Sequence, residues 1–299
     1  MAKEPRPLHG KVAAITGGAR GIGRATAQAF VREGMKVAIG DLDLEAAERT
    51  ATELGDGTIG LPLNVTDRGS FAAFLDEVES RLGPVDILIN NAGIMQLGRF
   101  LDESDATAHR MVDINLHGVI LGMKLVLPRM QTRNRGHVIN IASQAGKAGF
   151  PGGATYCATK HAVIGLSEAV RAELRDTDID VSYVMPAVVN TELGSGLMDA
   201  RGVKKLEPEE VADAIVDALR YGRVDVWVPR STKVINRLIT LMPRAGAEGI
   251  ARLLRADRIL AEPDTGVRRG YEERASRSEP GLEPDAQIPA EPEREREPV

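Results

Sequence analysis

The sequence is poor in cysteine and in aromatic residues: it has one cysteine, and Phe, Trp and Tyr together make up 3% of its 299 residues. Because Cys157 has no second cysteine to pair with, a disulfide within the chain is excluded, which is typical of a reducing cytoplasm. The five histidines lack the paired spacing of metal ligands, so we expect no metal site. We expect no signal peptide, because the first residues are polar, and no membrane span, because no apolar run is long enough.

The chain also lacks a basic excess, since 38 Lys and Arg residues stand against 43 Asp and Glu residues, for a net charge of −5. Without a basic surface over its main part, the protein is not expected to bind nucleic acid. The charge is nevertheless unevenly distributed. Residues 229–261 hold seven basic and two acidic residues, whereas residues 262–299 hold six basic and eleven acidic residues.

What the chain does have is a regular alternation of short apolar runs and amphipathic stretches between residues 11 and 228. This alternation predicts an α/β fold: a single Rossmann-fold domain with a doubly wound, seven-stranded parallel sheet, preceded by an N-terminal arm of residues 1–10. The strands are predicted at 12–16, 36–41, 58–63, 85–90, 137–142, 180–185 and 224–228.

Residues 229–261 have the pattern of a basic amphipathic helical extension, with one helix before Pro243 and a second from Gly246 to Leu260. Three roles are open for its apolar face: it packs over the substrate cleft of its own or a partner subunit, it caps the core, or it lies on an anionic membrane surface. We favour the two roles in which it packs on protein. The acidic segment 262–299 holds six prolines, and we expect it to be disordered and to carry no activity.

A glycine-rich turn containing Gly17, Gly21 and Gly23 follows the first predicted strand and opens a helix. Glycines let the backbone approach a pyrophosphate, and a helix N-terminus supplies free N–H groups and the positive end of a dipole. The second strand ends at Asp41, about 20 residues beyond the turn, where a ribose-binding carboxylate is expected. Together these features predict a dinucleotide site.

Tyr156 and Lys160 are four residues apart, so in a helix both side chains leave the same face. An ammonium beside a phenol favours the phenolate and lowers the pKa of the tyrosine, which suits it to exchange a proton with an alcohol or ketone oxygen. Ser143, at the end of a predicted strand, is placed to hydrogen-bond that same oxygen. We therefore predict acid–base catalysis by this group.

In order and spacing, these motifs, with Asn90-Asn91-Ala92-Gly93 and the segment from Pro186 to Thr191, resemble the short-chain dehydrogenase/reductase (SDR) family. Members of that family transfer a hydride between NAD(P) and a carbonyl or alcohol on a single Rossmann domain. The resemblance implies roles for four catalytic residues. Tyr156 would be the general acid/base, and Lys160 would bind the ribose. Ser143 would orient the substrate oxygen, and Asn115 would anchor a relay water.

The resemblance also implies a set of cofactor-binding residues, namely Gly17, Arg20, Gly21, Ile22, Gly23, Asp41, Asn64, Val65, Asn91, Ala92, Gly93, Tyr156, Lys160, Val189 and Thr191. The chain departs from the family pattern at Ala187, where a glycine is usual after proline, and at Asn64, where aspartate is frequent. An asparagine carbonyl can accept the same hydrogen bond from adenine. NAD is the expected cofactor because Asp41 would repel a 2′-phosphate, while Arg20 keeps NADP open as an alternative.

The predicted substrate pocket is mainly apolar and consists of Met95, Gln96, Gln144, Phe150, Leu193 and Leu197. It favours a lipophilic secondary alcohol or ketone, steroid-like or long-chain. We expect a cytoplasmic, NAD-dependent alcohol dehydrogenase or ketone reductase that forms a homodimer or homotetramer, with peripheral membrane contact through 230–261 left open. The alternatives are an NADP-dependent carbonyl reductase and a dinucleotide-binding sensor or scaffold without turnover. Against the scaffold, all four catalytic residues are intact.

Overall fold

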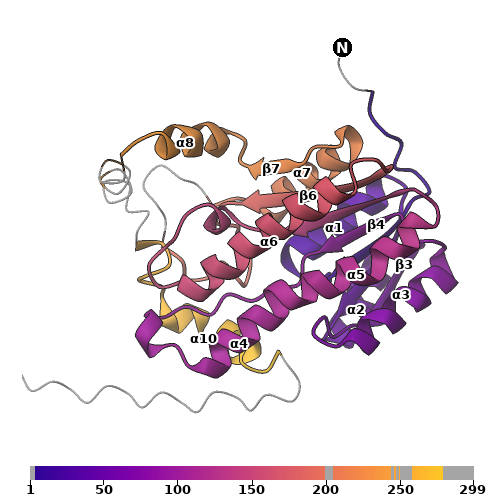
Figure 1. The fold of residues 1–299 in the computed structure, drawn as a ribbon. Helices are drawn as coiled ribbons and strands as arrows, with labels where there is room; N and C mark the ends of the chain where they lie inside the picture. Colours follow the sequence, from indigo (N-terminus) through magenta and orange to yellow (C-terminus); the bar gives the residue numbers. More distant parts are fainter. Residues whose placement is uncertain (1–3, 199–204, 244–245, 247–248, 250–257, 279–299) are drawn as a thin grey trace, which may run out of the picture.

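The computed structural model describes residues 4–198, 205–243, 246, 249 and 258–278. Its centre is one parallel sheet of seven strands in the order β3-β2-β1-β4-β5-β6-β7 (Figure 1). This confirms the predicted doubly wound α/β fold. The strands lie close to their predicted positions and are β1 (Val12–Thr16), β2 (Lys36–Asp41), β3 (Thr58–Pro62), β4 (Ile87–Asn90), β5 (Gly136–Ile141), β6 (Ile179–Pro186) and β7 (Asp225–Val228).

The central strands are mostly apolar because helices cover both faces of the sheet. Every residue of β1 and β4 is buried. One face packs against α1 (Gly21–Arg32), α2 (Leu44–Leu54) and α7 (Pro208–Tyr221). The other face packs against α3 (Arg68–Leu82), α5 (Gly118–Gln131) and α6 (Ala154–Glu173), so the core consists of two layers separated by the sheet.

The carboxyl ends of the strands define where a ligand can bind. β1 pairs with β2 on one side and with β4 on the other, so the chain leaves β1 in one direction and later returns on the opposite side. A crevice opens at such a switch point, beyond the carboxyl ends of the strands. The glycine turn follows β1, Asp41 ends β2, Asn91 follows β4 and Ser143 follows β5, so the topology brings all of these segments to one edge.

One long helical run crosses the core beside this edge. It consists of α4 (Asp105–Val112), a π-helical turn (Asp113–His117) and α5. This stretch of 27 residues, Asp105–Gln131, contains an 18-residue window with a mean hydropathy of 1.3. By length and composition it could span a membrane, so the sequence-based statement that no run reaches that length was wrong. Its apolar character has a local explanation, because Val119, Met123 and Val126 are buried in the core.

The C-terminal part of the chain differs from expectation. The helix expected before Pro243 is present as α8 (Ser231–Thr240), whereas most of the second one, 246–260, lies outside the described residues. The expected disorder of 262–299 is wrong for its first part, because α10 (Thr265–Ala275) forms there and Arg268 and Ala275 are buried. Its N-cap is Asp264, whose side chain accepts a hydrogen bond from the Val267 N–H. Residues 279–299 lie outside the described part.

Candidate active site

The turn after β1 is shaped by glycines that leave no space for side chains. Gly17 and Gly21 have positive φ angles of 61° and 52°. A Cβ atom on Gly23 would lie 2.3 Å from the Gly17 carbonyl oxygen, and one on Gly17 would lie 2.9 Å from the Ala92 Cα. The turn therefore leaves bare backbone at the crevice, which suits the close approach of a pyrophosphate.

The N-terminus of α1 faces the same crevice. Arg20 occupies the N-cap position but its side chain makes no capping hydrogen bond, so the N-cap residue leaves the first N–H groups of the helix to other partners. Gly21 and Ile22, the first two helical residues, line the cavity. An anion placed here would receive these N–H groups and the positive end of the helix dipole. The residues present therefore fit the dinucleotide that the sequence predicts.

The loop after β4 is tied to the glycine turn by Asn91 and Thr16. The Asn91 Nδ2 donates to the Thr16 and Gly17 carbonyl oxygens at 2.9 and 2.8 Å. In return, the Thr16 Oγ1 accepts the backbone N–H groups of Asn91 and Ala92, both at 3.0 Å. Gly93 follows, and a Cβ there would lie 3.1 Å from the Asn115 Oδ1. This network fixes the two loops between which a dinucleotide would lie.

Asp41 presents its carboxylate at the end of β2. Its Oδ2 accepts the Ala19 N–H at 3.1 Å and its Oδ1 accepts the Asp43 N–H at 3.2 Å. Burial raises the pKa of this carboxyl, although the two backbone N–H groups oppose that shift. The side chain lines the cavity beside the glycine turn, where it can accept hydrogen bonds from ribose hydroxyls.

Arg20, the basic residue of the turn, is bound to Asp43. The Arg20 guanidinium lies 2.6 Å from the Asp43 Oδ2, and both side chains are partly exposed. The hydrogen bond that Arg20 donates to Asp43 raises the pKa of Arg20 and lowers the pKa of Asp43. Asp43 also caps α2 by accepting the Ala46 N–H at 3.0 Å. The guanidinium is thus held by an acid at the start of α2.

Asn64 and Val65 line the cavity as the resemblance implied. The Asn64 Oδ1, however, accepts hydrogen bonds from the Thr66 N–H at 3.1 Å and from the Thr66 Oγ1 at 2.8 Å. A carbonyl oxygen has two lone pairs, and both are used here. In the free protein this carbonyl is therefore engaged by Thr66, and its hydrogen bond to the adenine amino group stays a prediction.

Asn115 lies in the π-helical turn and is completely buried. Its Oδ1 accepts the Ile94 N–H at 2.8 Å and its Nδ2 donates to the Ile94 carbonyl at 2.8 Å. A second contact runs from Nδ2 to the Thr159 Oγ1 at 3.3 Å, which connects Asn115 to α6. π-Helical turns occur often at functional sites, and here the turn places an amide between the loop after β4 and the catalytic helix.

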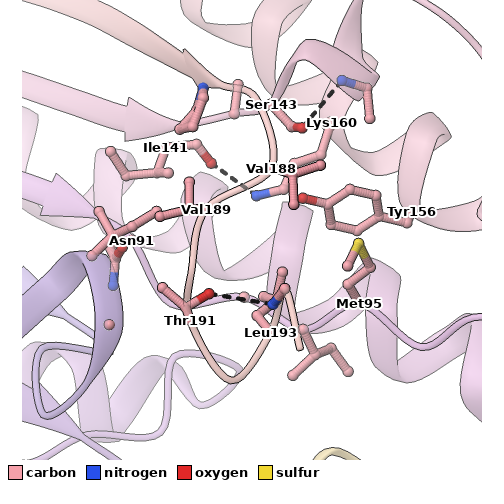
Figure 2. A pocket seen from close by; sticks show the side chains of 18 of the residues that line it. Asn91, Met95, Ile141, Ser143, Tyr156, Lys160, Val188, Val189, Thr191 and Leu193 are labelled. Atoms are coloured by element: carbon pink, nitrogen blue, oxygen red, sulfur yellow. Dashed lines mark hydrogen bonds between the residues drawn. The ribbon is translucent and has the colours of Figure 1, made fainter. Parts of the chain in front are cut away.

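Tyr156 and Lys160 lie one turn apart on α6, as predicted, and both are buried. Figure 2 shows the Lys160 ammonium and the Tyr156 hydroxyl on the same side of the cavity, pointing toward one another. The Lys160 Nζ lies 5.7 Å from the centre of the Tyr156 ring and donates to the Ile141 carbonyl at 2.8 Å. Ser143 lies just beyond Ile141 and hydrogen-bonds Tyr156. The structure thus brings these three side chains into one group.

The pKa values of this group differ from the sequence-based expectation. Burial raises the pKa of Tyr156 to about 12, and the hydrogen bond from Ser143 offsets only part of that shift. Burial lowers the pKa of Lys160 to about 8. Lys160 was expected to lower the pKa of Tyr156, but desolvation is the larger effect in the protein alone, because it disfavours the charged form of both groups. Tyr156 is therefore held in its protonated form near neutral pH.

The segment after β6 closes the crevice opposite the glycine turn. Ala187 continues the sheet contact by donating its N–H to the Val228 carbonyl at 2.8 Å, so the methyl group in place of the usual glycine leaves this pairing intact. Val189 and Thr191 both line the cavity. The Thr191 Cγ2 lies 3.2 Å from the position that a Cβ on Gly21 would take. The segment is therefore packed directly on the glycine turn.

These segments enclose a cavity of about 1130 Å³ that runs from the glycine turn past Tyr156 to the C-terminal helices. Five of the six predicted pocket residues line it: Met95, Gln144, Phe150, Leu193 and Leu197. Gln96 does not. Its Oε1 accepts from the Arg110 Nη1 at 3.4 Å and it hydrogen-bonds Glu272, so it contacts the far side of the loop.

Sequence reasoning missed the contribution of the C-terminal segments. The part of the cavity beyond Tyr156, here called the substrate cavity, is also lined by Ile235 and Ile239 of α8, by Ile259 and Leu260, and by Tyr271 of α10. A signal for α10 was present, since Asp264 is a good N-cap and Arg268 and Glu272 have the spacing of a helical ion pair. The composition of 262–299 as a whole hides this signal, because most of its prolines come after α10.

Comparison with known proteins agrees with this geometry. The short chain dehydrogenase family model matches residues 11–202. The chain belongs to the short-chain dehydrogenase family. It is 40% identical over 223 residues to a sorbitol dehydrogenase of Cereibacter sphaeroides, covering 73% of this chain and 87% of that protein. It is 37% identical over 214 residues to a 3-alpha-(or 20-beta)-hydroxysteroid dehydrogenase of Mycobacterium tuberculosis, covering 70% and 82%.

A solved structure of an SDR from Burkholderia phymatum in complex with NAD matches with a TM-score of 0.73 at 28% identity, covering 79% of this chain and 94% of that one. The SDR resemblance is therefore confirmed. The protein is an oxidoreductase with activity of the alcohol-dehydrogenase type, and its Rossmann fold binds a nicotinamide dinucleotide. The matched region ends before α8 and α10, so the family model does not describe that part of the substrate cavity.

Proposed function

We propose that the protein transfers a hydride between NAD and a lipophilic secondary alcohol or ketone, with Tyr156 as the general acid/base. The observation that carries this proposal is the common cavity. The glycine turn and Asp41 lie at one end, Tyr156 with Ser143 and Lys160 lies in the middle, and apolar side chains of the C-terminal segments form the other end. A dinucleotide and an organic substrate would therefore meet at the tyrosine.

In the proposed reaction, Ser143, Tyr156 and Lys160 have different roles. When bound, the nicotinamide supplies the hydride to a ketone or accepts it from an alcohol. Ser143 and Tyr156 hydrogen-bond the substrate oxygen, and Tyr156 gives that oxygen a proton during reduction and removes one during oxidation. Because burial holds Tyr156 protonated, the free protein is prepared for reduction. Lys160, whose pKa burial lowers to about 8, is suited to restore that proton.

Asn115 takes the role of an anchor in this proposal. Both of its amide atoms are bound to Ile94, and its Nδ2 also reaches Thr159, the residue before Lys160. An amide fixed in this way keeps the loop after β4 and the catalytic helix at a constant separation. It would thereby hold the path along which a proton passes from Lys160 to solvent.

Two observations support NAD as the preferred cofactor. The Asp41 carboxylate lies at the end of β2, where it would occupy the position of a 2′-phosphate. The competing signal, Arg20, is bound to Asp43 and is not free to receive a phosphate without breaking that ion pair. An NADP-dependent carbonyl reductase remains the alternative, and it would require that pair to open.

The walls of the substrate cavity favour a lipophilic substrate. Phe150, Leu193 and Leu197 from two loops combine with Ile235 and Ile239 of α8 to make the far end apolar. The two relatives named above are called dehydrogenases of a polyol and of hydroxysteroids. Of these two classes, the apolar side chains favour a steroid-like or long-chain molecule, because they match its apolar surface, while the polar lining residues can bind a limited number of substrate oxygens.

The test is a direct assay of the purified full-length protein with NADH and NADPH against lipophilic and polyhydroxylated ketones, following the absorbance of the reduced nicotinamide. We expect the highest kcat/KM for NADH with a lipophilic ketone. A chain that binds NADH but turns over no ketone, and no alcohol with NAD, would instead be a dinucleotide-binding sensor or scaffold. A clear preference for sugars would overturn the substrate class alone.

We further propose that the protein works in the cytoplasm as a homodimer or homotetramer. The lone Cys157 is buried and its pKa is raised by burial, which suits a structural thiol. α8 leaves part of its apolar face exposed: Leu238 is 60% exposed, and Leu241, which follows the helix, is 84% exposed. A partner subunit that covers this face is the favoured arrangement, and contact with an anionic membrane is the alternative.

A further inference from the structure

Arg268 of α10 is a buried cation, 1% exposed, that joins three separate segments of the chain. Its Nη1 donates to the carbonyl oxygens of Leu193 and Ser195 at 2.9 and 2.8 Å, and its Nη2 donates to the Met95 carbonyl at 2.8 Å. Its Nε donates to the Glu272 Oε1 at 3.0 Å. A guanidinium is suited to this work because its donors point outward in a fixed plane.

These bonds connect the two loops that form the substrate cavity. Met95 belongs to the loop after β4, and Leu193 and Ser195 belong to the loop after β6. Met95 and Leu193 line the cavity. A second connection joins the Arg274 Nη2 to the Glu192 Oε2 at 2.8 Å, and both residues also line the cavity. The spacing of the two loops, and therefore the width of the cavity, depends on α10.

Tyr271 is held on the inner side of the same helix. The Arg268 guanidinium lies over its ring, 4.9 Å from the ring centre. Its hydroxyl accepts the Met95 N–H at 2.7 Å, and among the described residues no acceptor receives the proton of that hydroxyl. Burial raises the pKa of Tyr271, so the hydroxyl keeps that proton, and the neighbouring Tyr156 adds to the shift. Tyr271 lines the cavity and is thus a second phenol near the catalytic one.

We propose that α10 completes the substrate site: Arg268 positions the two loops, and the Tyr271 hydroxyl donates a hydrogen bond to a second oxygen of the substrate. The first oxygen is the carbonyl or alcohol oxygen that reacts at Tyr156. The substrate class is then a lipophilic ketone or alcohol with a further hydroxyl, carbonyl or ether oxygen near the reacting carbon. This inference rests on the proposed function, because it assigns the reacting oxygen to Tyr156.

Tyr156 and Tyr271 both line the cavity, and their hydroxyls have different hydrogen-bond partners. Tyr156 is bound by Ser143, whereas Tyr271 accepts from a backbone N–H and has its own donor free for a ligand. An apolar substrate without a second oxygen would leave that buried donor unpaired. Leaving a buried donor without a partner disfavours binding, so the arrangement selects for the oxygenated substrate.

The test for Tyr271 compares cyclohexanone with its 2-, 3- and 4-hydroxy derivatives, using the full-length protein, NADH, and the Tyr271→Phe variant. We expect the wild type to prefer at least one hydroxyketone, and the variant to lose that preference by roughly 2- to 10-fold in relative kcat/KM. Loss of the bond to the Met95 N–H would affect all four ketones alike, so the ratio isolates the ligand contact. An unchanged ratio would overturn the role of Tyr271.

The test for Arg268 uses Arg268→Met and Arg268→Lys, with Arg269→Met on the exposed side of α10 as the matched control. We expect Arg268→Met to raise KM for the preferred ketone by more than tenfold, Arg268→Lys to restore part of it, and the control to match the wild type. The Kd for NADH should stay within about twofold, since Arg268 donates to Met95, Leu193, Ser195 and Glu272, and none of these belongs to the glycine turn. Equal losses of NADH and ketone binding would show a general structural role and contradict the proposal.

The two proposals fail in different ways. If the wild type reduces none of the ketones with NADH or NADPH, the proposed function itself is wrong. If the wild type reduces them but shows no hydroxyketone preference, hydride transfer stands and only the assignment of Tyr271 falls.

Discussion

The Arg20 guanidinium lies 2.6 Å from the Asp43 carboxylate, across the mouth of the dinucleotide site. Both side chains belong to segments that a cofactor ribose would contact, because Arg20 begins α1 and Asp43 begins α2. The pair would add to the effect of Asp41. The Asp41 carboxylate would occupy the place of a 2′-phosphate, and the Asp43 carboxylate binds Arg20, the cation that could neutralise that phosphate. If the protein prefers NAD as proposed, we therefore expect two acids, Asp41 and Asp43, to determine that preference together.

This relationship predicts that Asp43→Asn shifts the enzyme toward NADP. Asparagine keeps an oxygen to cap α2 but cannot form the ion pair, so Arg20 becomes available to a phosphate. A hydrogen bond to a charged group contributes about 1.5–3 kcal/mol, so the NADP/NAD ratio of kcat/KM should rise about tenfold or more. The double variant with Arg20→Gln should lose the gain. If the single variant keeps the wild-type ratio, Arg20 plays no part in cofactor choice.

Tyr156→Phe should abolish turnover while leaving cofactor binding intact. The substitution keeps the ring that packs in the core and removes the hydroxyl that holds the proton. Loss of a general acid/base lowers rates by about 10²–10⁴-fold. Steady-state kinetics measure the loss, and NADH fluorescence checks that the cofactor still binds. A variant that turns over near the wild-type rate is incompatible with the proposed mechanism.

Lys160 should make stability rise with pH between about 8 and 10. Its pKa is about 8 in the folded protein and 10.5 for the ordinary side chain, so in this window the unfolded chain binds more protons than the folded one. Stability therefore increases with pH there, by at most about 3 kcal/mol across the window. Tyr156, whose pKa is raised from 10.0 to about 12, acts in the opposite direction only above pH 10.

Urea unfolding of the wild type, Lys160→Met and Lys147→Met at pH 7, 8, 9 and 10 measures this effect. The free energy of unfolding of Lys160→Met should lack the rise. Lys147, which lies 3.8 Å from Glu168 on the surface, is the control and should keep it. If Lys160→Met and the wild type have the same pH dependence, burial does not shift the pKa of Lys160.

The sequence predicted the part of the site that local rules determine. A glycine turn between strand and helix fixes its own backbone, and a parallel strand order brings Asp41, Asn91 and Ser143 to one edge. The spacing of Tyr156 and Lys160 determines their common face on any helix. These features can be predicted without knowing which distant residues are in contact, and the structure places each of them at the cavity.

What the sequence could not show depends on contacts between distant segments. The pKa of Tyr156 follows from burial by the rest of the fold, which outweighs the neighbouring lysine. The order of α10 comes from Arg268, whose acceptors lie more than 70 residues away along the chain. The contact of the Asn64 Oδ1 with Thr66, which donates to it in the free protein, was likewise not expected from the sequence.

Two truncations should separate α10 from the segment that follows it. A chain that ends after Ser278 keeps every contact of Arg268 and Tyr271 and should match the full-length protein in KM and thermal midpoint. A chain that ends after Ala261 loses them, so the Met95 and Leu193 carbonyls lose their donor and activity on bulky ketones should fall by more than tenfold. Equal activity of the two truncations would show that α10 has no part in the substrate cavity.

The exposed face of α8 should be a contact between subunits. Val234 and Leu238 of this helix and Leu241, which follows it, are largely exposed. Burying a few hundred Å² of apolar surface is worth several kcal/mol at about 25 cal/mol per Å². Leu238→Glu with Leu241→Glu should therefore lower the oligomeric mass measured by light scattering and reduce activity on bulky ketones. The matched control, Thr240→Glu, adds a charge to the same helix outside this group. If the double variant keeps its mass but the wild type sediments with phosphatidylglycerol vesicles and the variant does not, the face binds membrane instead.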